Sequence, residues 1–150
     1  MKVRQGFVSN SSSSSFLVIK NYGERVNPII PIHFIVPRKS YAETEFGMHG
    51  NTYHDFDSKL NFAYLLALYE DNQRYVDMLE SVLKKMTRAE TIEWKLTNED
   101  IEMEGFSYGS IDHGSLPDED SPEVLRIFED EETLADFLFN NESYISFTRG

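Results

Sequence analysis

The chain has 150 residues and a formal net charge of −12, with 40% hydrophobic and 13% aromatic residues. This length suits one domain, and the apolar content is too high for a disordered chain. The absence of cysteine excludes disulfides, thiolate nucleophiles and cysteine-ligated metal centres. No apolar core of signal-peptide length follows the basic N-terminus, and no apolar run approaches the roughly 20 residues of a membrane span. We therefore expect a soluble, cytoplasmic protein with no membrane partner.

The N-terminal part of the chain predicts two strands followed by a loop. Residues 16–20 form a short run of apolar and β-branched side chains, which is typical of a buried strand. Residues 29–36 predict a second strand, but proline lacks the amide donor of a central strand. This strand should therefore lie at an edge or begin after Pro31. Residues 38–56 show no clear period and predict a loop.

A helical hairpin is predicted next. Asp57 or Ser58 can cap a helix that runs to about Tyr69, and Asn72 can cap a second helix that runs to about Thr87. The first helix is apolar on almost every side, whereas the second is amphipathic. We therefore expect the first helix to be central and buried.

The second half of the chain predicts a strand pair, two short helices and a last strand. Apolar residues alternate with polar ones over residues 92–96 and again over 101–104, which indicates an antiparallel hairpin. Residues 121–123 resemble a helix start, with proline at the first helical position. Residues 130–140 predict a second short helix, and residues 144–148 predict a closing strand.

These elements predict one α+β domain over residues 1–150, in the order β-β-α-α-β-β-α-α-β, with a mixed or antiparallel sheet packed against the helical hairpin. The charged side chains are unevenly distributed along the chain. Residues 1–98 hold 11 acidic and 12 basic side chains, whereas residues 99–150 hold 15 acidic and two basic ones. An acidic region, 99–136, would repel phosphate backbones, so we expect a basic protein partner and no direct nucleic-acid binding. The acids are equally compatible with a solvated surface, or with mimicry of nucleic acid that inhibits a basic host protein.

The most unusual part of the chain is the string GFVSNSSSSSF at residues 6–16, within a Ser-rich segment that covers residues 1–15. Its hydroxyl and amide groups suit docking on a partner, binding of an anion or covalent modification, and the run is equally compatible with local structure or a flexible linker. Docking is the main hypothesis. The predicted partner-binding residues, from this run and the acidic region, are Ser9, Asn10, Ser11, Ser12, Ser13, Ser14, Ser15, Asp118, Glu119, Asp120, Glu131 and Glu132.

The opening string resembles that of a family of small uncharacterised proteins of large tailed bacteriophages and some bacteria. The string YGSIDHGS at residues 108–115 and the string FLFN at residues 137–140 are similar to the same family. The resemblance implies a phage-type accessory protein, located in the host cytoplasm or the virion. It transfers no catalytic residue.

Histidine and aspartate side chains support an alternative, a metal-binding domain or metal-dependent hydrolase. Imidazole and carboxylate ligands suit a divalent ion, whose bound water can attack a phosphoester. The spacing matches no defined metal signature, and a polar loop with an Asx turn explains the same residues. The candidate ligands are His49, His54, Asp57, Asp112 and His113, whereas His33 is predicted to be a satisfied core or edge histidine.

Catalysis by serine is not expected, because adjacent Asp112 and His113 side chains rarely orient each other as a triad requires. The chain also lacks a phosphate-binding loop with a lysine and a dinucleotide fingerprint. The sequence therefore predicts a non-enzymatic protein without an organic cofactor, which acts by binding another protein.

Overall fold

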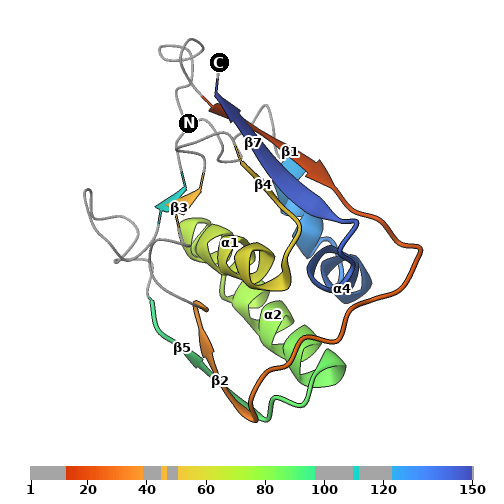
Figure 1. The fold of residues 1–150 in the computed structure, drawn as a ribbon. Coiled ribbons are helices and arrows are strands. Elements are labelled where there is room, and N and C mark those ends of the chain that lie inside the picture. Colours follow the sequence, from red (N-terminus) through yellow and green to blue (C-terminus); the bar gives the residue numbers. More distant parts are fainter. Residues whose placement is uncertain (1–12, 39–44, 47–50, 97–109, 112–122, 150) are drawn as a thin grey trace.

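Helices lie between small sheets in this chain, and the predicted α+β class is confirmed (Figure 1). The computed structural model describes residues 13–38, 45–46, 51–96, 110–111 and 123–149. The strands and helices, in chain order, are β1 (Ser13–Val18), β2 (His33–Val36), β3 (Glu45–Phe46), β4 (Thr52–Tyr53), α1 (Phe56–Tyr69), α2 (Gln73–Met86), β5 (Thr91–Trp94), β6 (Ser110–Ile111), the 3-10 helix η3 (Glu123–Phe128), α4 (Glu131–Phe139) and β7 (Tyr144–Arg149).

The predicted helical hairpin is confirmed as α1 and α2. The side chain of Asp55 caps α1 by accepting from the Ser58 N–H at 2.9 Å, so the helix begins slightly earlier than predicted. Every residue from Ser58 to Ala67 is buried, which makes α1 the central helix. Asn72 caps α2 as predicted, and α2 buries one face only, through Leu79, Val82 and Leu83.

The C-terminal helices pack against this hairpin. Asp130 caps α4 by accepting from the Thr133 N–H at 2.7 Å, and the helix predicted over 130–140 is confirmed. The ring of Phe128, at the end of η3, stacks on Tyr75 of α2 with centroids 4.2 Å apart. Both α4 and η3 therefore contribute to the same apolar core as α1 and α2.

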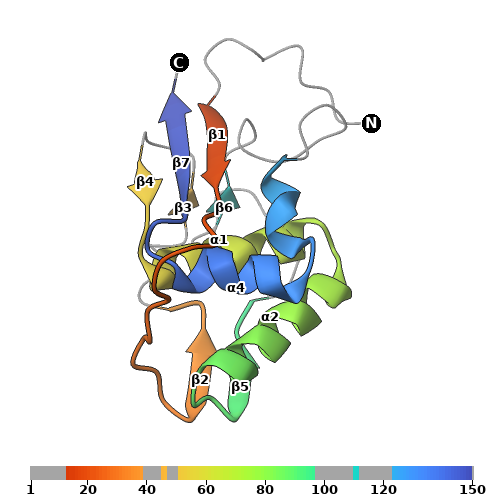
Figure 2. The ribbon, with the colours of Figure 1, turned by 90° about the vertical axis from the view of Figure 1, so that its right-hand side faces the viewer.

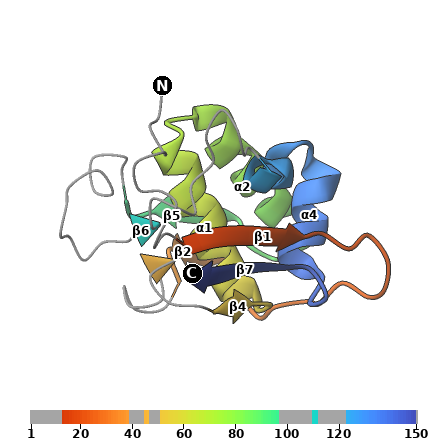
Figure 3. The same ribbon diagram turned by 90° about the horizontal axis from the view of Figure 1, so that it is seen from above.

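Sheet A is the three-stranded sheet of the order β1-β7-β4, with β7 at its centre and antiparallel to both neighbours. Leu17 of β1 and Ile145 of β7 are register partners and both point into the core. Phe147 of β7 meets Phe62 of α1 edge-to-face, with centroids 5.6 Å apart. Sheet A thus packs one face on α1, which crosses beneath it in Figure 3.

The remaining strands form two parallel pairs, β2 with β5 and β3 with β6. The expectation of a start after Pro31 is confirmed by β2. The expectation of a loop over 38–56 is wrong at β3 and β4, two-residue strands whose pairing partners lie far along the chain. The hairpin predicted between 92–96 and 101–104 is not testable, because residues 101–104 lie outside the described part. Figure 2 shows the β2–β5 pair at the other end of the molecule from sheet A.

Candidate docking surface

The outer face of sheet A presents aromatic and hydroxyl side chains to solvent. Side chains alternate across a strand, so burying Leu17 at 9% exposure turns its neighbour Phe16 outward, where it is 60% exposed. Phe16 is the register partner of Ser146, and Ser146 is the register partner of Thr52. These three residues form one row across all three strands of the sheet.

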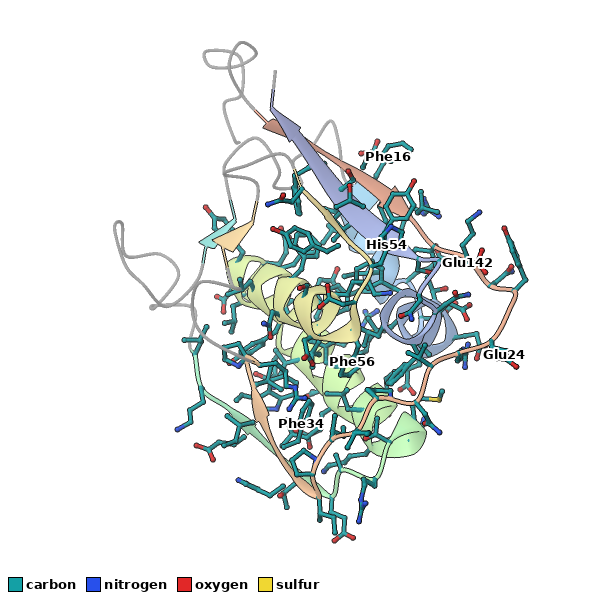
Figure 4. All side chains as sticks on the ribbon, in the orientation of Figure 1. Phe16, Glu24, Phe34, His54, Phe56 and Glu142 are labelled. Atoms are coloured by element: carbon teal, nitrogen blue, oxygen red, sulfur yellow. The ribbon has the colours of Figure 1, made fainter. Side chains whose placement is uncertain are left out.

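A second row of rings lies next to the first. Tyr144 contacts Phe16 with ring centroids 6.5 Å apart and His54 with centroids 4.8 Å apart. The Oγ atoms of Thr52 and Ser146 are 2.7 Å apart and share a hydrogen bond. We call these five residues, Phe16, Thr52, His54, Tyr144 and Ser146, the outer-face cluster. Figure 4 labels Phe16 and His54 beside sheet A.

The ring of His54 is held in one orientation. Its Nδ1 lies 2.9 Å from the carbonyl oxygen of Asn141, which can only accept, so Nδ1 carries a proton and donates it. In the neutral ring Nε2 is then the unprotonated nitrogen. The cluster is therefore pre-organised, with hydroxyls, a phenol and an imidazole around one exposed phenyl ring.

The Ser-rich segment leads into this surface. Ser13, Ser14 and Ser15 belong to β1 and pair with Arg149, Thr148 and Phe147. The flexible-linker interpretation is wrong for these three residues, because the pairing with β7 fixes their backbone. Ser9, Asn10, Ser11 and Ser12 lie outside the described residues.

The acids of α4 are engaged within the chain. Glu131 accepts from Lys85 Nζ at 2.7 Å and from the Ser81 hydroxyl at 3.1 Å, and these partners, Lys85 foremost, lower the pKa of its carboxyl. Glu132 accepts from Arg25 at 2.8 Å. These predicted partner-binding residues therefore tie α4 to α2 and to the segment before β2. The other predicted acids, Asp118, Glu119 and Asp120, lie outside the described residues.

The predicted metal ligands are only partly placed. His49, Asp112 and His113 lie outside the described residues. Asp57 accepts from Arg38 Nε at 2.9 Å, and the described ranges hold no group of three or more histidine or acidic side chains arranged for a metal ion. The structure thus brings no complete ligand set together in the part that it describes.

The imidazole of His33 lies on the exposed face of β2. It has the edge environment that the sequence predicted, with contacts to the Thr91 hydroxyl at 2.6 Å and the Glu93 carboxylate at 3.3 Å. Both partners belong to β5, so His33 links the two strands across their register.

Residues 105–109 read Gly-Phe-Ser-Tyr-Gly and match the G-x-S-x-G pattern of hydrolase nucleophile elbows, which the sequence prediction overlooked. In that elbow the serine ends a strand and opens a helix. Here Ser110–Ile111, directly after the pattern, form strand β6. The structure therefore shows a strand directly after the pattern, and residues 105–109 themselves lie outside the described part.

Lys59 is a buried cation that the sequence prediction missed. It is fully buried in α1, and its Nζ donates to the carbonyl oxygens of Asn140 and Ser143 at 2.9 and 3.0 Å. Burial lowers the pKa of its amine to about 8, while Asp55 acts in the opposite direction. The available signal was a lone lysine in a helix whose other residues are mostly apolar. Its enclosure makes it a structural link between α1 and the α4–β7 connection.

Comparison with known proteins adds no relative. No protein-family model matches the chain, and neither the curated proteins nor the solved structures gave a match. Among the described residues, no helix combines the length and hydropathy of a membrane-spanning segment.

Proposed function

We propose that this chain is a small, acidic, non-enzymatic accessory protein of phage type that acts by binding another protein. The outer-face cluster is the contact surface, extended by the Ser-rich segment that enters β1. The observation that supports it is Phe16, a phenyl ring 60% exposed on a strand whose backbone is fixed by six register pairs. Exposed aromatic side chains on rigid supports are the usual anchors of protein interfaces.

The partner carries a basic surface. The outer-face cluster contains no carboxylate or ammonium group, so the contact itself is neutral. The net charge of −12 acts at longer range and raises the encounter rate with a basic protein. Charge thus sets the association rate, and the cluster sets the lifetime of the complex.

The test is affinity purification of the wild-type protein from cells of its source organism, followed by binding kinetics with the purified partner. Phe16→Ser should raise the dissociation rate by about tenfold or more, since a buried phenyl ring is worth about 1.5–3 kcal/mol and each 1.4 kcal/mol is about a factor of ten. Raising the salt from about 50 to about 300 mM should lower the association rate.

Tyr22→Ser is the matched control, because Tyr22 is an aromatic residue 57% exposed outside sheet A. It should leave both rates unchanged. If Phe16→Ser binds as tightly as wild type while its thermal unfolding is also unchanged, the outer-face cluster is not the interface.

The second candidate, a metal-binding or metal-dependent hydrolytic protein, is supported by His54 alone. An imidazole whose Nδ1–H donates to a carbonyl presents Nε2 for coordination, as metal-bound histidines commonly do. Metal analysis of the purified protein tests it. Stoichiometric metal that is lost in His54→Ala would support this candidate, and metal-free protein without phosphoesterase activity would exclude it.

The third candidate, nucleic-acid mimicry, needs acidic side chains that are available to a partner, and the acids of α4 do not supply them. Its acids Glu131, Glu132 and Asp136 are all paired with cations of the same chain. Competition between this protein and DNA for one partner surface is the result that would revive it.

A further inference from the structure

The segment between β1 and β2 is held firmly against α4. The Val26 N–H donates to the carbonyl oxygen of Phe139 at 2.6 Å, and Arg25 pairs with Asp136 at 2.6 Å. On the other side, Ile30 is buried at 2% exposure. Residues 27–29 are therefore fixed at both ends.

This firmly held segment exposes an apolar side chain. Ile29 is 93% exposed, the highest value among the large hydrophobic residues that the structure describes as exposed. Pro28 before it restricts the backbone, and Ile32 after it is 46% exposed. Because the anchors on each side hold Ile29 in water, its exposure is built into the fold, as expected of an interface anchor.

Ile29 borders an open groove at the C-terminal end of α2. The groove has a volume of about 470 Å³ and is lined by Asn27, Pro28, Ile29, Met86, Thr87 and Arg88. Met86 also lines a smaller hollow of about 180 Å³ between α2 and α4. The volume and the mixed lining of the groove, in which Ile29 and Met86 are the large apolar side chains, suit one or two side chains of an extended peptide.

The groove carries one positively charged side chain. Arg88 is its only charged lining residue, and its guanidinium makes no ion pair with any residue in the described ranges. The cations of the neighbouring hollow differ, since Arg25 is paired with Asp136 and Lys85 with Glu131. A carboxylate next to an apolar side chain is the chemistry complementary to Arg88 and Ile29.

We propose that this groove binds an extended segment of a partner protein that carries an apolar side chain beside an Asp or Glu. The apolar side chain covers Ile29 and Met86, and the carboxylate pairs with Arg88. A second copy of this chain and an anionic lipid surface fit less well, because each carries many negative charges that a net charge of −12 repels, whereas the proposed segment needs a single carboxylate, placed at Arg88. The groove lies at the other end of the molecule from sheet A, so this site is additional to the outer-face cluster (Figure 2).

The experiment selects binders from a random library of short peptides with the purified full-length protein. Enriched peptides should carry an apolar residue within two positions of Asp or Glu. Addition of the best peptide should shift the backbone amide resonances of Asn27, Ile29 and residues 86–88, since Pro28 has no backbone N–H. No enrichment, enrichment without acidic residues, or shifts confined to sheet A would overturn the proposal.

Two variants then test the contacts with the best peptide. Ile29→Ser should weaken binding about tenfold, as expected for one buried aliphatic side chain. Arg88→Glu should weaken it and shift a repeated selection toward Lys and Arg. If both variants bind the peptide as tightly as the wild type, the proposal is overturned. Both side chains are exposed, and unchanged thermal unfolding would confirm that the variants are folded.

Phe16→Ser separates this proposal from the proposed function. It should leave peptide binding unchanged, whatever its effect on the partner of the outer-face cluster. Vesicles containing phosphatidylserine serve as the lipid probe. If wild type binds them and Ile29→Ser does not, the groove is a membrane contact and the peptide proposal is wrong.

Discussion

The buried charge of Lys59 makes the stability of this fold depend on pH in the alkaline range. Burial lowers the pKa of the Lys59 amine from its ordinary value of 10.5 to about 8 in the folded chain. The unfolded chain therefore holds this proton over a pH range in which the folded chain has lost it. Stability then rises with pH, starting near pH 8 and ending near pH 10.5.

The size of the effect follows from the two pKa values. Between pH 7 and pH 9.5 the linkage relation gives a gain in unfolding free energy of about 2 kcal/mol, since one pKa unit corresponds to about 1.4 kcal/mol. Stopping at pH 9.5 keeps the measurement below the ordinary tyrosine pKa of about 10.

Urea unfolding of wild type and of Lys59→Met at these two pH values measures this gain. Methionine keeps a similar unbranched stem and removes the titrating amine, so the variant should lack the gain of about 2 kcal/mol. Comparison of the two proteins cancels the titration of all other groups. At pH 7 the variant also loses the donor to Asn140 and Ser143, which changes its absolute stability and not its pH dependence.

Lys20→Met is the matched control. The hydroxyl of Tyr22 raises the pKa of Lys20, so this lysine does not titrate below pH 9.5, and its removal should leave the alkaline gain in place. If Lys59→Met shows the same rise between pH 7 and pH 9.5 as wild type, the assignment of Lys59 as a buried, titrating amine is refuted.

Two further predictions concern packing and the link to α4. Phe62→Ala should lower the unfolding free energy by about 3–5 kcal/mol, because Phe62 is fully buried against Phe147. Phe16→Ala, at an exposed position, should change the unfolding free energy by less than about 1 kcal/mol. Equal losses in the two variants would contradict the assignment of Phe62 to the core. Arg25→Gln should lower the unfolding free energy by about 1–3 kcal/mol, because the nearly buried carboxylate of Asp136 loses its cation, and the exposed Arg74→Gln serves as control. A loss in Arg25→Gln no larger than in Arg74→Gln would show that the ion pair does not hold the segment to α4.

The helices were predictable because their signals are local. Asn72 and Asp130 are side-chain caps that precede apolar residues at helical spacing, and both cap their helices in the structure. The cap of α1 was predicted at Asp57 or Ser58, and Asp55 takes that role instead. Three polar residues with capping ability lie close together there, so the sequence alone could not select one.

Strand pairing was less predictable because the partners are distant in sequence. The alternation of Ile92 and Trp94 indicated a strand, but it could not show that β5 pairs in parallel with β2, across the whole helical hairpin. β4 has two residues, which are too few to show any periodicity in the sequence. It is a strand only because it pairs with β7.

The outer-face cluster was predictable only in part, because the strand signals are local and the contacts between strands are not. Phe16 was expected in a strand, but its exposure depends on which face of sheet A meets α1. His54 was singled out as a metal ligand, and the structure adds its contact with Tyr144, which lies ninety positions further along the chain. Ile29 illustrates the same limit. Its sequence context predicted either an edge strand or a segment before a strand that begins after Pro31, and neither showed that contacts with α4 on one side and the burial of Ile30 on the other would leave Ile29 exposed.

The central position of β7 in sheet A has a consequence for how the protein is made. Synthesis proceeds from the N-terminus, and β1 and β4 leave the ribosome before their shared partner Tyr144–Arg149 exists. Until then Leu17 of β1 and Tyr53 of β4, whose side chains pack toward the core, lack the strand that pairs with both of them. The helical hairpin can form early, but sheet A must close after β7 has been synthesised. A chain that stops before Tyr144 would lose the middle of its sheet, not an edge, and would expose two unpaired strands to aggregation.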